Sequence, residues 1–172
     1  TGEEAGLTGV KRLDFSSLKG RVVMNLDCSD EGIVVGCAGS AVIRLELPVE
    51  REAVPGNWEC GELQIRGLKG GHSGLDITKE RGNANVLLAR ILSSLAETCQ
   101  VRVGGFHGGL QTNAICREAE AKIAFPAERR EEVEACLEAW ERILKKEFKI
   151  SDPDVRVGLA EPAEGWGVLT PE

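Results

Sequence analysis

The chain has 172 residues, of which 42% are apolar and 28% are charged, so it can bury a core and has the length of one or two domains. Its 21 basic and 28 acidic residues give a net charge of −7, which argues against nucleic acid as a partner because a phosphate backbone attracts basic surfaces. No apolar run reaches the roughly 18 to 20 residues that span a bilayer, and the acidic, glycine-rich start is unlike a signal peptide. We therefore expect a cytoplasmic protein with no membrane partner.

The first 39 residues alternate short apolar runs with glycine and acidic turns. Residues 21–26 and 32–36 are short runs rich in β-branched residues, and Asp27 directly follows the first of them. Strands with carboxylates at their ends are typical of an α/β sheet whose site lies beyond the strand ends. Met24 is the only methionine, so the chain has no initiator residue, and we expect it to be a piece of a longer protein.

The next segments predict a hairpin and a helix. Residues 41–47 and 58–68 both alternate apolar with polar side chains, as half-buried strands do, and a turn region separates them. Asn83 or Asn85 is expected to cap a helix that runs to about residue 98. Its apolar side chains recur at helical spacing and predict a buried face: Leu87, Leu88, Ile91, Leu92 and Leu95.

The rest of the chain predicts a strand, a second strand, a long helix and a final strand, at residues 100–105, 118–125, 128–148 and 154–159. A glycine-rich turn around His107 is expected between the first two. From residue 62 onward the order is βαββαβ, which predicts an α+β, ferredoxin-like domain with residues 41–47 as an extra N-terminal strand. The last twelve residues carry two prolines and two glycines and are expected to form an extended tail.

Residues 67–85, GLKGGHSGLDITKERGNAN, have the composition of a binding loop. The glycines at 67, 70, 71 and 74 permit backbone angles and close approaches that a plain connector does not need. They surround His72, whose small neighbours cannot bury it, so we expect its imidazole to face solvent or a ligand. A plain turn histidine is the alternative.

This loop and three other segments resemble aminoacylhistidine dipeptidases, the Xaa-His or carnosinase-like members of the dizinc metallopeptidase clan that includes aminoacylases and carboxypeptidase G. The resemblance rests on sequences that occur in the family's order: TGEEAGLTG at 1–9, NLD with EG and GCAG between 25 and 39, GLKGGHSG with GNANVLLAR between 67 and 90, and GGLQTNAI at 108–115. It implies a partial catalytic-domain segment at 1–39, a lid and dimerisation domain at 40–160, and the tail at 161–172.

The resemblance implies three site residues in the first segment. Glu3 corresponds to the general base, and Glu4 and Asp27 correspond to ligands of the two zinc ions. A pair of zinc ions can hold both the nucleophile and the carbonyl oxygen of a substrate. Gly2 departs from the family, which usually has an acidic residue there, and this puts the local turn geometry in question.

In the lid, the resemblance implies that Asn113 contacts the carboxylate end of the substrate. Thr112 stands where the family usually has arginine and Cys116 where it usually has proline, so the expected cationic clamp is missing at this position. Arg117 could replace it, with a solvated strand-edge arginine as the alternative. His72 corresponds to a lid histidine that reaches the partner subunit's zinc site in a homodimer and stabilises the oxyanion of the tetrahedral intermediate.

These implications give a fragment of a zinc-dependent dipeptidase that hydrolyses Xaa-His dipeptides with metal-activated water. The family's metal-binding histidines have no counterparts here, since both histidines of the chain fall in lid segments, and we expect the isolated chain to be inactive and to bind zinc weakly. A related aminoacylase or tripeptidase activity remains an alternative. The other alternative is a stand-alone ferredoxin-like module for regulation or dimerisation, in which Glu3, Glu4 and Asp27 are inert surface acids.

Overall fold

The computed structural model describes residues 8–22, 24, 32–33, 35–36, 39, 41, 43–161 and 166–170. The chain divides into two units, residues 1–48 and 49–172. The described part of the first unit holds the short helix α1 (Thr8–Lys11) and the 3-10 turn η1 (Phe15–Ser17), all of it exposed. Residues 23, 25 and 26 of the strand predicted at 21–26 lie outside the described residues. None of the described helices is both long and apolar enough to cross a membrane.

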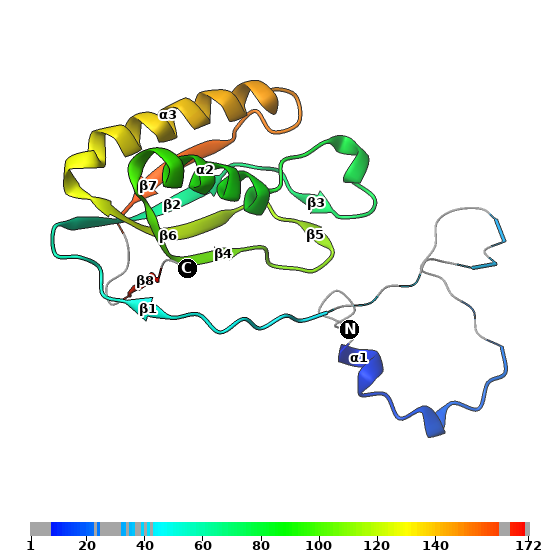
Figure 1. The fold of residues 1–172 in the computed structure, drawn as a ribbon. Helices are drawn as coiled ribbons and strands as arrows, with labels where there is room; N and C mark the ends of the chain where they lie inside the picture. Colours follow the sequence, from blue (N-terminus) through cyan, green and yellow to red (C-terminus); the bar gives the residue numbers. More distant parts are fainter. Residues whose placement is uncertain are drawn as a thin grey trace. The chain divides into compact units, whose positions relative to one another are not determined.

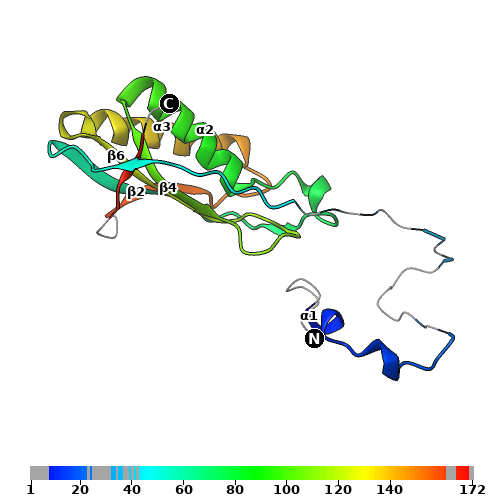
Figure 2. The same cartoon turned by 60° about the horizontal axis from the view of Figure 1, so that its bottom comes forward.

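The second unit is built on a four-stranded antiparallel sheet in the order β4-β6-β2-β7. Its strands are β2 (Trp58–Arg66), β4 (Arg102–Gly108), β6 (Ala119–Pro126) and β7 (Arg156–Ala160). The helices α2 (Ala84–Cys99) and α3 (Arg130–Glu147) lie over one face of the sheet (Figures 1 and 2). The order β2-α2-β4-β6-α3-β7 confirms the predicted α+β, ferredoxin-like domain.

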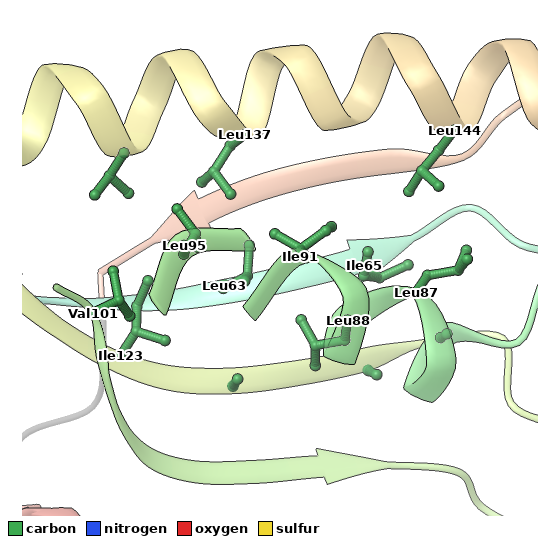
Figure 3. Close-up of a cluster of buried hydrophobic side chains, with 14 of the residues drawn as sticks. Leu63, Ile65, Leu87, Leu88, Ile91, Leu95, Val101, Ile123, Leu137 and Leu144 are labelled. Carbon is green, nitrogen blue, oxygen red and sulfur yellow. The ribbon is translucent and has the colours of Figure 1, made fainter. Parts of the chain in front are cut away.

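The core lies between the helices and the sheet, where the apolar faces of the helices pack against the apolar face of the sheet (Figure 3). Leu63 and Ile65 alternate with polar residues along β2 and are fully buried, as a strand with one covered face requires. The predicted stripe of α2 is buried against them, except that Leu92 is only partly buried. Leu137 and Leu144 of α3 cover the same layer. Asn83 is the α2 N-cap, since its side chain accepts a hydrogen bond from the Asn85 N–H at 3.0 Å.

Two short two-stranded ribbons accompany this sheet. In the first, β3 (Gly71–His72) pairs with β5 (Ala114–Ile115). In the second, β1 (Arg51–Glu52) pairs with β8 (Val168–Leu169), so part of the expected extended tail is a paired strand with Val168 fully buried. The Trp166 ring lies on Gly104 of β4, where a Cβ atom would collide with it. The turns η2 (Ile77–Lys79) and η3 (Ala127–Arg129) complete the unit.

Two predictions of local structure are wrong. The extra strand before β2 is β1, whereas residues 43–47 form no strand and expose Ile43, Leu45 and Leu47. The hairpin with β2 cannot form in this arrangement because β6 and β7 occupy both edges of β2. The turn predicted around His107 is also wrong, because β4 continues through Gly108 and pairs His107 with Glu120.

Candidate functional site

The two lid residues singled out by sequence, His72 and Asn113, lie next to each other in the structure. The β3–β5 pairing places His72 opposite Ala114, and the Ser73 N–H donates a 2.8 Å hydrogen bond to the Asn113 carbonyl oxygen. Segments about forty positions apart along the chain are therefore joined into one ribbon. Glu3, Glu4 and Asp27 lie outside the described residues, so their roles stay predictions.

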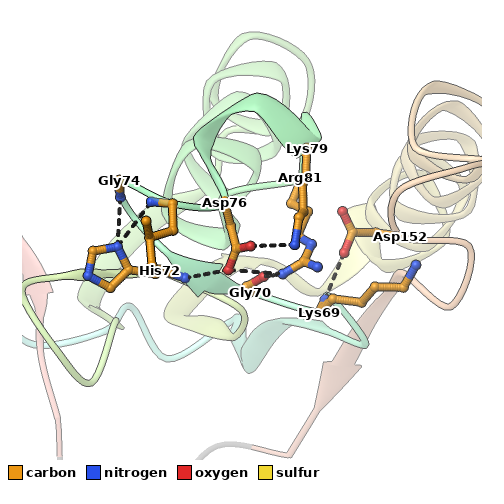
Figure 4. Close-up of polar contacts among 9 residues, drawn as sticks. Lys69, Gly70, His72, Gly74, Asp76, Lys79, Arg81 and Asp152 are labelled. Carbon is orange, nitrogen blue, oxygen red and sulfur yellow. Dashed lines mark hydrogen bonds and ion pairs between the residues drawn. The ribbon is translucent and has the colours of Figure 1, made fainter. Parts of the chain in front are cut away.

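The His72 side chain is exposed and its orientation is fixed by the backbone of its own turn (Figure 4). Nδ1 accepts hydrogen bonds from the N–H groups of Gly74 and Leu75, both at 3.1 Å. A nitrogen that accepts hydrogen bonds carries no proton, so the neutral imidazole holds its proton on Nε2. The ring therefore presents an N–H donor on the side away from the turn.

Asp76 is the polar centre of this turn. Its Oδ2 accepts the His72 N–H at 2.8 Å, and Lys79 Nζ lies 2.6 Å from Oδ1. Hydrogen bonding from Lys79, and then from the His72 N–H, holds the pKa of Asp76 below its ordinary value. Arg81 Nη1 lies 3.6 Å from Oδ2 and also donates to the Gly70 carbonyl oxygen. The carboxylate is therefore ionised at neutral pH, and it links the charged side chains of Lys79 and Arg81 to the backbone of His72.

Asp152, at the end of the turn after α3, holds the base of the same loop. It is the buried charged residue of the described core, and its carboxylate accepts the Lys69 N–H at 2.7 Å and the Gly82 N–H at 2.8 Å. These two residues flank the segment that carries His72 (Figure 4 shows the Lys69 bond). Sequence reasoning identified neither Asp76 nor Asp152. The only available signal was the acidic residue four positions after His72 in a glycine-rich loop.

A hollow of about 440 Å³ lies beside the β3–β5 ribbon, lined by parts of both ribbon strands and of β4 and β6. Arg66 on its wall is paired with Glu120 at 2.6 Å, while Lys69 and Arg117 also line it. The Arg117 side chain packs on Gly70, where an added Cβ would lie 3.1 Å from the Arg117 Cβ. Arg117 is exposed at the hollow and lies two residues beyond β5, the strand that Asn113 directly precedes.

The described residues do not fit a zinc ion, because among them no three histidine, cysteine, aspartate or glutamate side chains converge on one point. The Nδ1 atom of His72 is already used by two backbone N–H groups. The histidine thus has the geometry of a hydrogen-bond donor through Nε2 and not that of a ligand through Nδ1. The described residues around His72 therefore present an exposed imidazole N–H, and they contain no cluster of metal-binding side chains.

Comparison with known proteins agrees with this geometry. The cytosol non-specific dipeptidase of Escherichia coli K12 is 42% identical over 168 residues, which cover 97% of this chain and 35% of that protein. The crystal structure of aminoacylhistidine dipeptidase from Vibrio alginolyticus superposes with a TM-score of 0.69 at 35% identity, over 72% of this chain and 25% of that one. The chain thus spans about a third of the length of the curated relative.

The family described as the peptidase dimerisation domain matches residues 63–152. This range begins within β2 and ends at Asp152, so it holds α2, α3, both ribbon strands β3 and β5, and the whole His72 loop. The match covers more than half of the chain. The chain therefore belongs to the peptidase dimerisation domain family.

Proposed function

We propose that the complete protein is a zinc-dependent dipeptidase for Xaa-His dipeptides and that this chain supplies its lid and dimerisation domain. The 42% identity to a dipeptidase carries the proposal, because it extends over 97% of the chain and so includes residues before the dimerisation domain. A stand-alone module for dimerisation would need only the second unit. A related aminoacylase or tripeptidase is the remaining alternative within the enzyme class.

In the proposed reaction, His72 donates a hydrogen bond from Nε2 to the carbonyl oxygen of the scissile peptide, where negative charge develops. Its exposed ring and the backbone bonds to Nδ1 support this role, because they leave a preset N–H donor facing outward. In the dimer, that donor reaches the site of the partner subunit. A fixed donor contributes more than a mobile one because little reorganisation remains for the transition state.

Asn113 is proposed to contact the C-terminal carboxylate of the dipeptide. The hollow beside it bears Lys69 and Arg117, which supply the positive charge that Thr112 does not. Zinc, when bound, supplies Lewis acidity for activating water. We propose Glu4 and Asp27 as zinc ligands and Glu3 as the general base, with the remaining ligands in the part of the protein beyond this chain.

The homodimer is proposed to form through this domain, by way of a sheet edge or the helices. The four-stranded sheet ends in β4 on one side and β7 on the other, and a strand at the edge of a sheet has backbone groups available for pairing. The match to a peptidase dimerisation domain supports this assembly. It also agrees with the proposed role of His72 in the partner's site.

The test compares the complete protein with two variants at His72, using Xaa-His and Xaa-Leu dipeptides as substrates. His72→Ala is expected to lower kcat about 100- to 1,000-fold with KM changed by less than about threefold, because the donor acts mainly in the transition state. His72→Gln restores an N–H donor on a flexible side chain and should lose less. Ser73→Ala is the matched control, since the described contacts of Ser73 use its backbone.

Two outcomes would contradict the proposal. Full activity of the His72→Ala dimer would remove the histidine from the reaction. Equal kcat/KM for Xaa-His and Xaa-Leu substrates would leave a dipeptidase without the proposed specificity. Circular dichroism and the sedimentation coefficient of each variant separate loss of catalysis from loss of fold or assembly.

A further inference from the structure

His72 and Asp76 form a closed ring of backbone and side-chain hydrogen bonds. The His72 N–H donates to Asp76 Oδ2 at 2.8 Å, and the Asp76 N–H donates back to the His72 carbonyl oxygen at 3.0 Å. Together these bonds bring the N–H groups of Gly74 and Leu75 under the imidazole. The tautomer of the ring thus depends on the shape of a turn that the Asp76 carboxylate holds.

Arg81 forms an ion pair with the same carboxylate. Its Nη1 lies 3.6 Å from Asp76 Oδ2 and donates to the carbonyl oxygen of Gly70 (Figure 4). Gly70 and Gly71 have φ angles of 63° and 143°, and a Cβ on Gly71 would collide with both the Asp76 carboxylate and the Arg81 guanidinium. Glycine at 71 therefore lets the ion pair lie directly on the backbone that leads into His72.

The position of Asp76 in the chain does not by itself account for these contacts. It precedes η2, where aspartate commonly caps a helix by accepting a backbone N–H two or three residues later. Asp76 makes no such side-chain bond to η2. Its oxygens are instead directed to the His72 N–H, Lys79 and Arg81. These contacts hold the backbone of the histidine in place.

We propose that Asp76, held by Arg81, is a positioning residue that fixes His72 as the Nε2–H tautomer with its donor facing outward. The effect on catalysis rests on the proposed function of His72, but the tautomer does not. The contact of Asp76 with His72 is through the backbone N–H and carbonyl of the histidine, so Asp76 acts through the histidine and not on a substrate.

The tautomer can be measured on the 172-residue chain by proton–nitrogen correlation NMR of the imidazole rings. The chain has only two histidines, and a His107→Gln variant assigns the signals of His72. The unvaried chain should show His72 protonated on Nε2 alone. Asp76→Ala should give a mixture of both tautomers, and Asp76→Asn, which keeps an oxygen acceptor, should retain part of the preference. Thr78→Ala is the control, because Thr78 is exposed in the same turn and no described hydrogen bond uses its side chain.

A His72 that carries its proton on Nδ1, or an Asp76→Ala chain with an unchanged Nε2–H tautomer, would overturn the proposal. If the alanine variant does not fold, the same decision rests on Asp76→Asn together with Arg81→Gln, which removes the charge that holds the carboxylate. Both variants are expected to weaken the Nε2–H preference, and an unchanged preference in both would equally overturn it.

The kinetic arm uses the complete protein. Asp76→Ala is expected to lower kcat about tenfold or more with little change in KM, since a small displacement of a catalytic donor is costly. A double variant with both Asp76→Ala and His72→Ala should lose no more activity than His72→Ala alone, because Asp76 acts through the histidine.

If the NMR result holds while His72→Ala is fully active, the proposed function fails and the positioning role stands. If Asp76→Ala keeps full activity while His72→Ala does not, the positioning role in catalysis fails and the function stands.

Discussion

At the scale of single residues, Asp152 connects the stability of the domain to the placement of the site. It is fully buried, and its two oxygens satisfy the N–H groups of Lys69 and Gly82 at the two ends of the His72 loop. Its own N–H donates to the Phe148 carbonyl oxygen at the end of α3. A single carboxylate thus anchors both ends of the loop to the helix layer.

Asp152→Ala is expected to lower the free energy of unfolding by about 2–4 kcal/mol, because the buried Gly82 N–H and the partly buried Lys69 N–H both lose their acceptor. Urea denaturation followed by circular dichroism measures this change. Asp154→Ala is the matched control, since Asp154 is exposed and lies two residues away. A loss in the Asp152 variant no larger than in the control would show that water replaces the carboxylate at both N–H groups.

Sequence motifs located part of the candidate site and missed the rest for a physical reason. His72 lies in a loop whose glycines mark it, and Asn113 lies in a second glycine-flanked motif. Asp152 is 70 positions from Gly82 and follows an ordinary helix end, so its buried bond to the loop depends on tertiary packing that no local pattern records. Asp76 was within the motif, but its direction toward the His72 N–H depends on the φ angles of Gly70 and Gly71.

At the scale of elements, Glu141 links α3 to the edge strand β7. Its carboxylate accepts the Val157 N–H at 3.0 Å and pairs with Lys145 one turn along the helix. The Lys145 bond, and then the Val157 N–H, hold the pKa of Glu141 below its ordinary value of 4.5. Because the folded state favours the ionised form, this contact stabilises the fold above pH 4.5 and is lost as the pH falls below that value.

Glu141→Gln should therefore cost about 1 kcal/mol of unfolding free energy at neutral pH and less in acid, so the two stability curves converge as the pH falls. Urea denaturation at a series of pH values between about 3 and 7 measures the difference. Glu138→Gln on the same helix is the control, because no described hydrogen bond uses its carboxylate. A constant difference across this pH range would mean that the charge of Glu141 is not what holds β7.

The order of the main elements could be predicted because each has a periodic pattern that burial enforces. The stripes of α2 and α3 and the alternation of β2 and β6 all face one core. Residues 41–47 have the alternation of a strand, but the described residues among them pair with no described strand, since the edges of β2 are taken by β6 and β7. The ribbon of β1 and β8 was not predicted because strands of two residues carry no period, and their pairing joins residues more than a hundred positions apart.

At the scale of the whole molecule, we propose that the domain supplies one part of a larger site. It matches a peptidase dimerisation domain at residues 63–152, and the chain covers 35% of the length of its dipeptidase relative. Both histidines lie in the β3 and β4 strands of the second unit, and the described residues contain no cluster of metal-binding side chains. Three carboxylates without an imidazole make a weak zinc site, so Glu3, Glu4 and Asp27 alone are not expected to hold the metal firmly.

The isolated 172-residue chain is therefore expected to show no hydrolysis of an Xaa-His dipeptide, even with zinc added, while the complete protein prepared in parallel is active. The chain should nevertheless fold and dimerise, because its core and sheet edges are contained within the second unit. Ninhydrin detection of released histidine measures hydrolysis, titration calorimetry measures zinc affinity, and sedimentation equilibrium measures the dimer.

A mixture of the chain with a complete protein bearing His72→Ala tests the donor separately. Mixed dimers should regain part of the lost activity, since the chain offers an intact His72 to the partner's zinc site. Hydrolysis of the dipeptide by the isolated chain would contradict the proposal that the catalytic site is divided between this domain and the rest of the protein.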